Sequence, residues 1–121
     1  MTDGPMLLEM LGLSRDRDAG TVACTVERRH RQSNGVVHGS VIHALLDTAM
    51  GIACYRAAGK SPVATAEISI RYLVPVFDGR LDASARVVKA GKRLIVVEGD
   101  VHRSGERVAI GQATFVPIRA S

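Results

Sequence analysis

The chain has 121 residues, of which 46% are hydrophobic and 23% charged, and its formal net charge is +4 at pH 7. This length suits one globular domain over residues 1–121, and the composition excludes a disordered chain. Aromatic residues make up only 3% and the positive balance is modest, so a nucleic-acid partner is not expected.

The sequence indicates where the protein is located and whether it holds a metal ion. Residues 1–5 lack the basic start and long apolar run of a secretory signal, so we expect a cytoplasmic protein. Three ionisable residues interrupt the apolar stretch 36–54, which argues against a membrane span. Cys24 and Cys54 lack metal-ligand spacing, and the histidines match no zinc motif, so no metal site is predicted.

Hydrophobic periodicity predicts a short helix, a strand, a long helix and four further strands. Their expected ranges are a helix from Pro5 to Leu13, a strand from Gly20 to Glu27, a helix from Gly39 to Ala58, and strands over 65–72, 81–88, 94–102 and 107–116. Asn34-Gly35 indicates a turn, Gly59 should close the long helix, and Ser104-Gly105 indicates a hairpin. The order predicts an α+β domain in which an antiparallel β-sheet wraps around one long buried central helix.

Asp47 is the most informative residue, because it lies within the most apolar stretch of the chain. Desolvating a carboxylate costs several kcal/mol unless partners compensate, so this acid is either a working group or a structural hydrogen-bond acceptor. Helical spacing places small and polar residues on the same face of the predicted long helix as Asp47, namely Ser40, His43, Gly51 and Cys54.

An ordered motif precedes and includes this acid: Gln32-x-x-Gly35-x-x-His38-Gly39-Ser40, followed by Leu45-Leu46-Asp47. It resembles the hotdog-fold thioesterases, and within them the phenylacetate-pathway (PaaI-like) acyl-CoA thioesterases. The family pattern is Asn-x-x-Gly-x-x-His-Gly-Gly followed by Leu-x-Asp, so Gln32 replaces the Asn and Ser40 the second Gly. Thr65 at the start of one strand and Gly91-Lys92-Arg93 before another extend the resemblance over roughly residues 6–117.

The resemblance implies a hotdog fold and hydrolysis of an acyl-CoA thioester. Asp47 would act as the general base for water or as the nucleophile, while the Gly39 N–H and His38 polarise the thioester carbonyl. Gln32 would orient the carbonyl or water, and Thr65 would position the water. Three of these residues also have a structural alternative: Gly39 forming a tight turn into the helix, His38 bonded to loop backbone, and Thr65 serving only as a strand former.

The expected substrate contacts are Asn34, Ser40, Met50, Gly91, Lys92 and Arg93. Lys92 and Arg93 would meet the phosphates of coenzyme A (CoA), although exposed basic residues at a strand edge also discourage edge pairing. CoA is part of the substrate, so no separate cofactor is expected. The sequence does not specify the acyl group.

The separation of Gly39 and Asp47 along the predicted helix indicates how many chains form a site. Eight residues of helix separate Gly39 from Asp47, or about 12 Å, whereas both groups must lie within roughly 3–4 Å of one reacting centre. Gly39 of one subunit must therefore face Asp47 of another, as in a twofold homodimer. The family resemblance adds pairing of dimers into a homotetramer. The alternatives are a non-catalytic acyl-CoA-binding protein and a hotdog enoyl-CoA hydratase or dehydratase.

Overall fold

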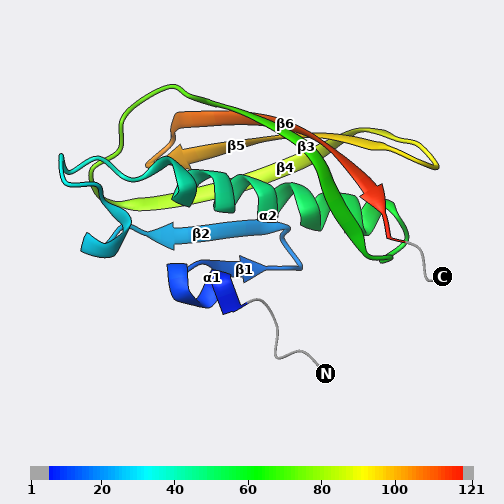
Figure 1. The fold of residues 1–121 in the computed structure, drawn as a ribbon, viewed down its shortest axis with the longest axis horizontal. Helices are drawn as coiled ribbons and strands as arrows, with labels where there is room; N and C mark the ends of the chain where they lie inside the picture. Colours follow the sequence, from blue (N-terminus) through cyan, green and yellow to red (C-terminus); the bar gives the residue numbers. More distant parts are fainter. Residues whose placement is uncertain (1–5, 119–121) are drawn as a thin grey trace.

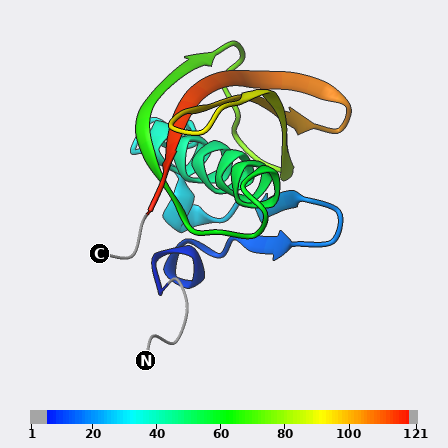
Figure 2. The same cartoon turned by 90° about the vertical axis from the view of Figure 1, so that its right-hand side faces the viewer.

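A long helix, α2 (Gly39–Ala57), lies in the concave face of a six-stranded antiparallel sheet, as Figures 1 and 2 show. The computed structural model describes residues 6–118. The other elements are α1 (Met6–Leu11), β1 (Ser14–Asp16), β2 (Thr21–Thr25), the 3-10 helix η1 (Arg28–His30), β3 (Val63–Tyr72), β4 (Arg80–Ala90), β5 (Ile95–Arg103) and β6 (Glu106–Pro117). The strand order is β1-β2-β4-β5-β6-β3. The predicted α+β architecture is confirmed.

Both ends of α2 are closed by local hydrogen bonds. At its start, Nδ1 of the N-cap residue His38 accepts the Ser40 N–H at 3.0 Å. At its end, Gly59 has φ +70°, its N–H bonds the Arg56 carbonyl at 3.2 Å, and the Lys60 N–H reaches the Tyr55 carbonyl at 2.8 Å. This is a Schellman motif, which requires a left-handed residue and confirms that Gly59 terminates the helix. Within residues 6–118, no helix is both long and apolar enough to cross a lipid bilayer.

The sheet packs closest against α2 at two glycines, Gly99 of β5 and Gly111 of β6, which are paired across the two strands. A Cβ at Gly99 would lie 2.8 Å from the Ser84 carbonyl oxygen and 3.3 Å from Met50, and one at Gly111 would lie 3.1 Å from Leu46. Leu46 and Met50 are fully buried beneath them. This close packing fixes the depth of α2, and with it the position of the residue after Leu46, which is Asp47.

The segment after β2 forms η1 around a buried histidine. His30 is 1% exposed, its Nδ1 accepts the Glu27 N–H at 2.8 Å, and its Nε2 lies 2.5 Å from the Leu11 carbonyl oxygen. Because Nδ1 accepts a hydrogen bond, the ring proton is on Nε2, which donates to Leu11. The His30 carbonyl in turn accepts the His38 N–H at 2.8 Å, so the hydrogen bonds of His30 position the start of α2.

Asp100 of β5 lies on the sheet face away from α2 and is only 8% exposed. Arg86 donates to its Oδ1 at 2.8 Å, and Arg107 lies 3.6 Å from its Oδ2. Burial raises the pKa of Asp100, but the hydrogen bond and charge of Arg86, together with the charges of His102 and Arg107, outweigh burial and hold the pKa below the ordinary value of 3.8. The folded state therefore favours the ionised carboxylate.

Asp100→Asn is expected to lower the free energy of unfolding at pH 7 by about 1–3 kcal/mol, because it removes hydrogen bonds to a charged group. A lowered folded-state pKa contributes stability above the unfolded-state pKa, and this is lost as the pH falls through the folded value. Urea unfolding of both proteins at pH 7 and at pH 3 should show the difference shrinking at pH 3. A pH-independent difference would contradict this. The exposed pair Arg80–Asp82 provides the control, and Asp82→Asn should cost less than about 1 kcal/mol.

Candidate active site

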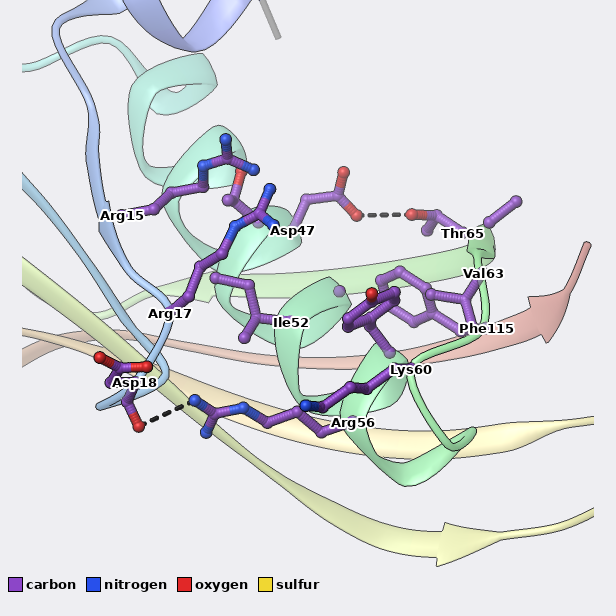
Figure 3. A pocket seen from close by; sticks show the side chains of 14 residues that line it. Arg15, Arg17, Asp18, Asp47, Ile52, Arg56, Lys60, Val63, Thr65 and Phe115 are labelled. Atoms are coloured by element: carbon purple, nitrogen blue, oxygen red, sulfur yellow. Dashed lines mark hydrogen bonds between the residues drawn. The ribbon is translucent and has the colours of Figure 1, made fainter. Parts of the chain in front are cut away.

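Asp47 lies halfway along α2, between the buried side chains of the helix and an open groove. It is half-buried rather than enclosed, so the cost of desolvation is smaller than the sequence suggested. The Thr65 hydroxyl donates to Asp47 Oδ1 at 2.7 Å, as Figure 3 shows. Oδ2 has no hydrogen-bond partner among residues 6–118. One carboxylate oxygen is thus held while the other is available to a water molecule or substrate.

A β-bulge brings Thr65 to this position. Thr65 is opposite Phe115 of β6, but Glu67 is opposite Thr114, so Ala66 is an extra residue in β3. A bulge reverses which side chains face each side of the sheet. Strict alternation would place Thr65 on the face opposite to Ile68, whereas the bulge places both on the α2 side. The Asp47–Thr65 pair depends on this irregularity.

The first turn of α2 presents two hydrogen-bond donors. Because His38 Nδ1 accepts the Ser40 N–H, the neutral ring carries its proton on Nε2, and the side chain is exposed. The Gly39 N–H is at the first helical position and has no partner among residues 6–118. The Tyr72 hydroxyl donates to the Gly39 carbonyl at 3.2 Å. His38 is therefore bonded to backbone and still has a free donor.

The loop before α2 holds its polar side chains away from Asp47. Gln32 bonds through its backbone to Val36 at 2.8 Å and to Gly35 at 2.9 Å. The Asn34 side chain accepts the Val36 N–H at 3.0 Å, forming a local turn. Gln32 and Asn34 are both exposed, and neither lines the groove. One chain does not bring these residues together with Asp47.

The groove beside Asp47 has a volume of about 920 Å³. Figure 3 shows the side chains that line it, which come from β1, the β1–β2 turn, α2, the α2–β3 loop, β3 and β6. Apolar lining comes from Ile52, Val63 and Phe115, and Gly51 leaves space one turn beyond Asp47.

The other predicted contacts lie outside this groove. Met50 is fully buried against the sheet glycines, so it does not line the cavity. Ser40 is exposed at the start of α2. Gly91, Lys92 and Arg93 form the exposed β4–β5 turn, where the Gly91 N–H bonds the Leu94 carbonyl at 2.9 Å. A single chain therefore gives these residues no contact with the Asp47 groove.

Neither cysteine is suited to nucleophilic attack. Burial raises the pKa of the Cys54 thiol to about 11, and burial also raises that of Cys24 despite the nearby Arg29. Both thiols are therefore protonated at neutral pH. Within residues 6–118, no three His, Cys, Asp or Glu side chains are arranged to hold a metal ion.

Sequence reasoning missed the basic side chains of the groove: Arg15, Arg17, Arg56 and Lys60. β1 is a three-residue exposed strand with no hydrophobic alternation, so nothing in the sequence predicted that Arg15 would reach α2. The Schellman motif that brings Lys60 back along the helix could have been inferred from Gly59.

Comparison with known proteins gives consistent matches. A family model described as the thioesterase superfamily matches residues 34–110. A presumed esterase of Halobacterium salinarum is 32% identical, over 90% of this chain and 82% of that protein. A Bacillus halodurans protein solved with CoA is 32% identical with a TM-score of 0.86, over 95% of this chain and 77% of that one. A mutant of the phenylacetic acid degradation protein PaaI from Thermus thermophilus is 25% identical with a TM-score of 0.85, over 94% and 100%. The expected hotdog fold and the PaaI resemblance are confirmed.

Proposed function

Because this chain belongs to the thioesterase superfamily, we propose that it hydrolyses the thioester bond of an acyl- or aryl-CoA to give the free acid and CoA. The observation that carries this proposal is the Asp47–Thr65 pair, which opens on a groove and lies on the same helix as the free Gly39 N–H. Hydrolysis needs such a carboxylate together with a donor for the developing oxyanion. The CoA of the Bacillus halodurans structure supports CoA as the carrier. Water is the only co-reactant, so no cofactor is needed.

Asp47 acts in one of two ways. As a general base, it takes a proton from a water molecule positioned with Thr65 while the water oxygen attacks the carbonyl carbon. The carbon–sulfur bond then breaks and the CoA thiolate accepts a proton. As a nucleophile, an Asp47 oxygen displaces CoA to form a mixed anhydride, which water hydrolyses. Both routes place negative charge on the carbonyl oxygen, where an N–H donor is required.

A second copy of the chain supplies that donor. Gly39 and Asp47 lie on one unbroken helix, about 12 Å apart, so they cannot serve the same carbonyl from one chain. β3 is one of the two edge strands of the sheet, and it ends in the exposed side chain of Tyr72 beside Gly39. Pairing of β3 with its twofold mate would bury this edge and place Gly39 of the partner subunit toward Asp47. His38 of the partner subunit would then direct Nε2–H to the same carbonyl, and such dimers would assemble into a tetramer.

The proposal is tested by free-thiol release from phenylacetyl-, hydroxybenzoyl- and short- to long-chain acyl-CoA, with the particle mass measured in parallel. Turnover by a dimer or tetramer is expected. Binding of these compounds without turnover would identify a non-catalytic acyl-CoA-binding protein. Hydration of an added enoyl-CoA in place of thiol release would identify a hydratase. An active monomer would contradict the two-chain site.

A further inference from the structure

Four cationic side chains line the groove without carboxylate partners. Among residues 6–118, none of Arg15, Arg17, Arg56 and Lys60 forms an ion pair. Among residues 6–118, the carboxylates that line the groove are Asp18 and Asp47. Its lining therefore has an excess of positive charge that the chain does not neutralise there.

Two sets of hydrogen bonds shape the β1–β2 turn beside these cations, and Figure 3 shows the bond from Arg56 to Asp18. Asp16 Oδ1 accepts the N–H groups of Asp18 and Ala19, which shapes the β1–β2 turn that carries Arg17. Arg56 donates to the Asp18 carbonyl at 2.8 Å and lies over Gly20, where a Cβ would come within 2.9 Å of its guanidinium. The turn is thus docked on the last turn of α2.

Lys60 occupies a backbone position that favours glycine. Its φ is +65°, and Ser104 is the only other non-glycine residue with positive φ among residues 6–118. A side chain is unfavourable in this conformation, yet the chain has a lysine here and it lines the groove. Lys60 therefore adds a fourth cation to the groove despite this backbone conformation.

We propose that Arg15, Arg17, Arg56 and Lys60 form a subsite for an oxyanion group of the thioester substrate, on the same chain as Asp47. This inference rests on the proposed thioesterase function. Guanidinium groups bind phosphate and carboxylate oxygens through paired hydrogen bonds, and an ammonium adds a mobile charge. Arg56 follows Asp47 by nine residues, or about 14 Å along the helix axis, so the anion is remote from the reacting carbonyl. It is either a phosphate of CoA or a carboxylate at the far end of the acyl group.

The test compares the wild type with Arg15→Gln/Arg17→Gln and with Lys60→Gly. Substrates are butyryl and glutaryl thioesters of CoA and of N-acetylcysteamine, which lacks the CoA phosphates. For the substrates that carry the anion bound by the subsite, we expect the double variant to raise KM about tenfold or more, with kcat largely retained. Lys60→Gly should also raise KM, while its Tm stays equal to or above that of the wild type because glycine suits the backbone. Ser104→Gly, on the β5–β6 turn, should retain the wild-type KM.

The substrate pattern identifies the anion. A KM effect confined to CoA thioesters supports a phosphate ligand, whereas an effect confined to glutaryl thioesters on both carriers supports an acyl carboxylate. Unchanged KM for all four substrates in folded variants would overturn the subsite. If the wild type cleaves none of them, the proposed function fails, and calorimetric titration with CoA and with glutarate tests the subsite alone. Weaker binding by the double variant than by the wild type would then support it, and equal or absent binding would overturn it.

Discussion

Replacing Asp47 by asparagine is expected to lower kcat for thioester hydrolysis by about 100-fold or more, the loss typical when a general base or nucleophile is removed. The substitution is nearly isosteric, and the asparagine Oδ1 can still accept the Thr65 hydroxyl that now lies 2.7 Å from the carboxylate. The amide can neither take a proton from water nor attack the carbonyl. Free-thiol release measures the loss, and thermal unfolding together with particle mass shows whether fold and assembly are retained.

Asp82→Asn is the matched control for this substitution. Asp82 is an exposed carboxylate of β4 outside the groove, so the same chemical change there should leave kcat near the wild-type value. Undiminished turnover by a folded Asp47→Asn protein would exclude Asp47 from the mechanism, in both its general-base and its nucleophilic form.

Gly39→Pro is expected to lower kcat by about 10²–10³-fold, because it removes one backbone N–H that would stabilise the oxyanion. The backbone is already suited to proline: Gly39 is the first helical residue, and His38 before it has φ −63° and ψ 136°. The helix should therefore form as before. Turnover of the best CoA substrate, with helix content from circular dichroism, measures the effect.

Gly39→Ala separates loss of the donor from crowding. A Cβ at this position would lie 3.2 Å from the Tyr72 hydroxyl oxygen, and alanine introduces that atom while keeping the N–H. We expect alanine to cost far less activity than proline. Equal losses in the two variants would assign the effect to contact with Tyr72 and leave the N–H without a catalytic role.

The features that could be read from the sequence are those with a strong local cause. The apolar run and Gly59 predicted α2 to within one residue of its end, and alternation predicted β3 to β6. Asp47 stood out because a carboxylate on an apolar helix needs an explanation. Gly39 was identified because a helix starting there leaves its N–H unpaired.

The remaining features arise from contacts between segments distant in sequence. β1 is too short and too exposed to show a hydrophobic period, so the basic groove that it helps to form was not predicted. His30 is buried because it reaches the Leu11 carbonyl, 19 residues earlier, and no local pattern indicates that contact. The proposed roles of Lys92 and Gln32 involve surfaces that one chain does not bring to Asp47, so they stay predictions about the assembled protein.

The bulge at Ala66 has a consequence for how this strand tolerates changes in length during evolution. Loss of that one codon would restore strict alternation, and Ile68 and Ile70 could still pack against α2 opposite β6. Thr65 would then stay opposite Phe115 on the α2 side and keep Asp47, because it would be two residues from Ile68. At the present length Thr65 and Ile68 are three residues apart, and only the bulge lets both side chains face α2. Variants that pair β3 with β6 without the bulge, at unchanged length, would therefore keep the same architecture and turn Thr65 away from Asp47.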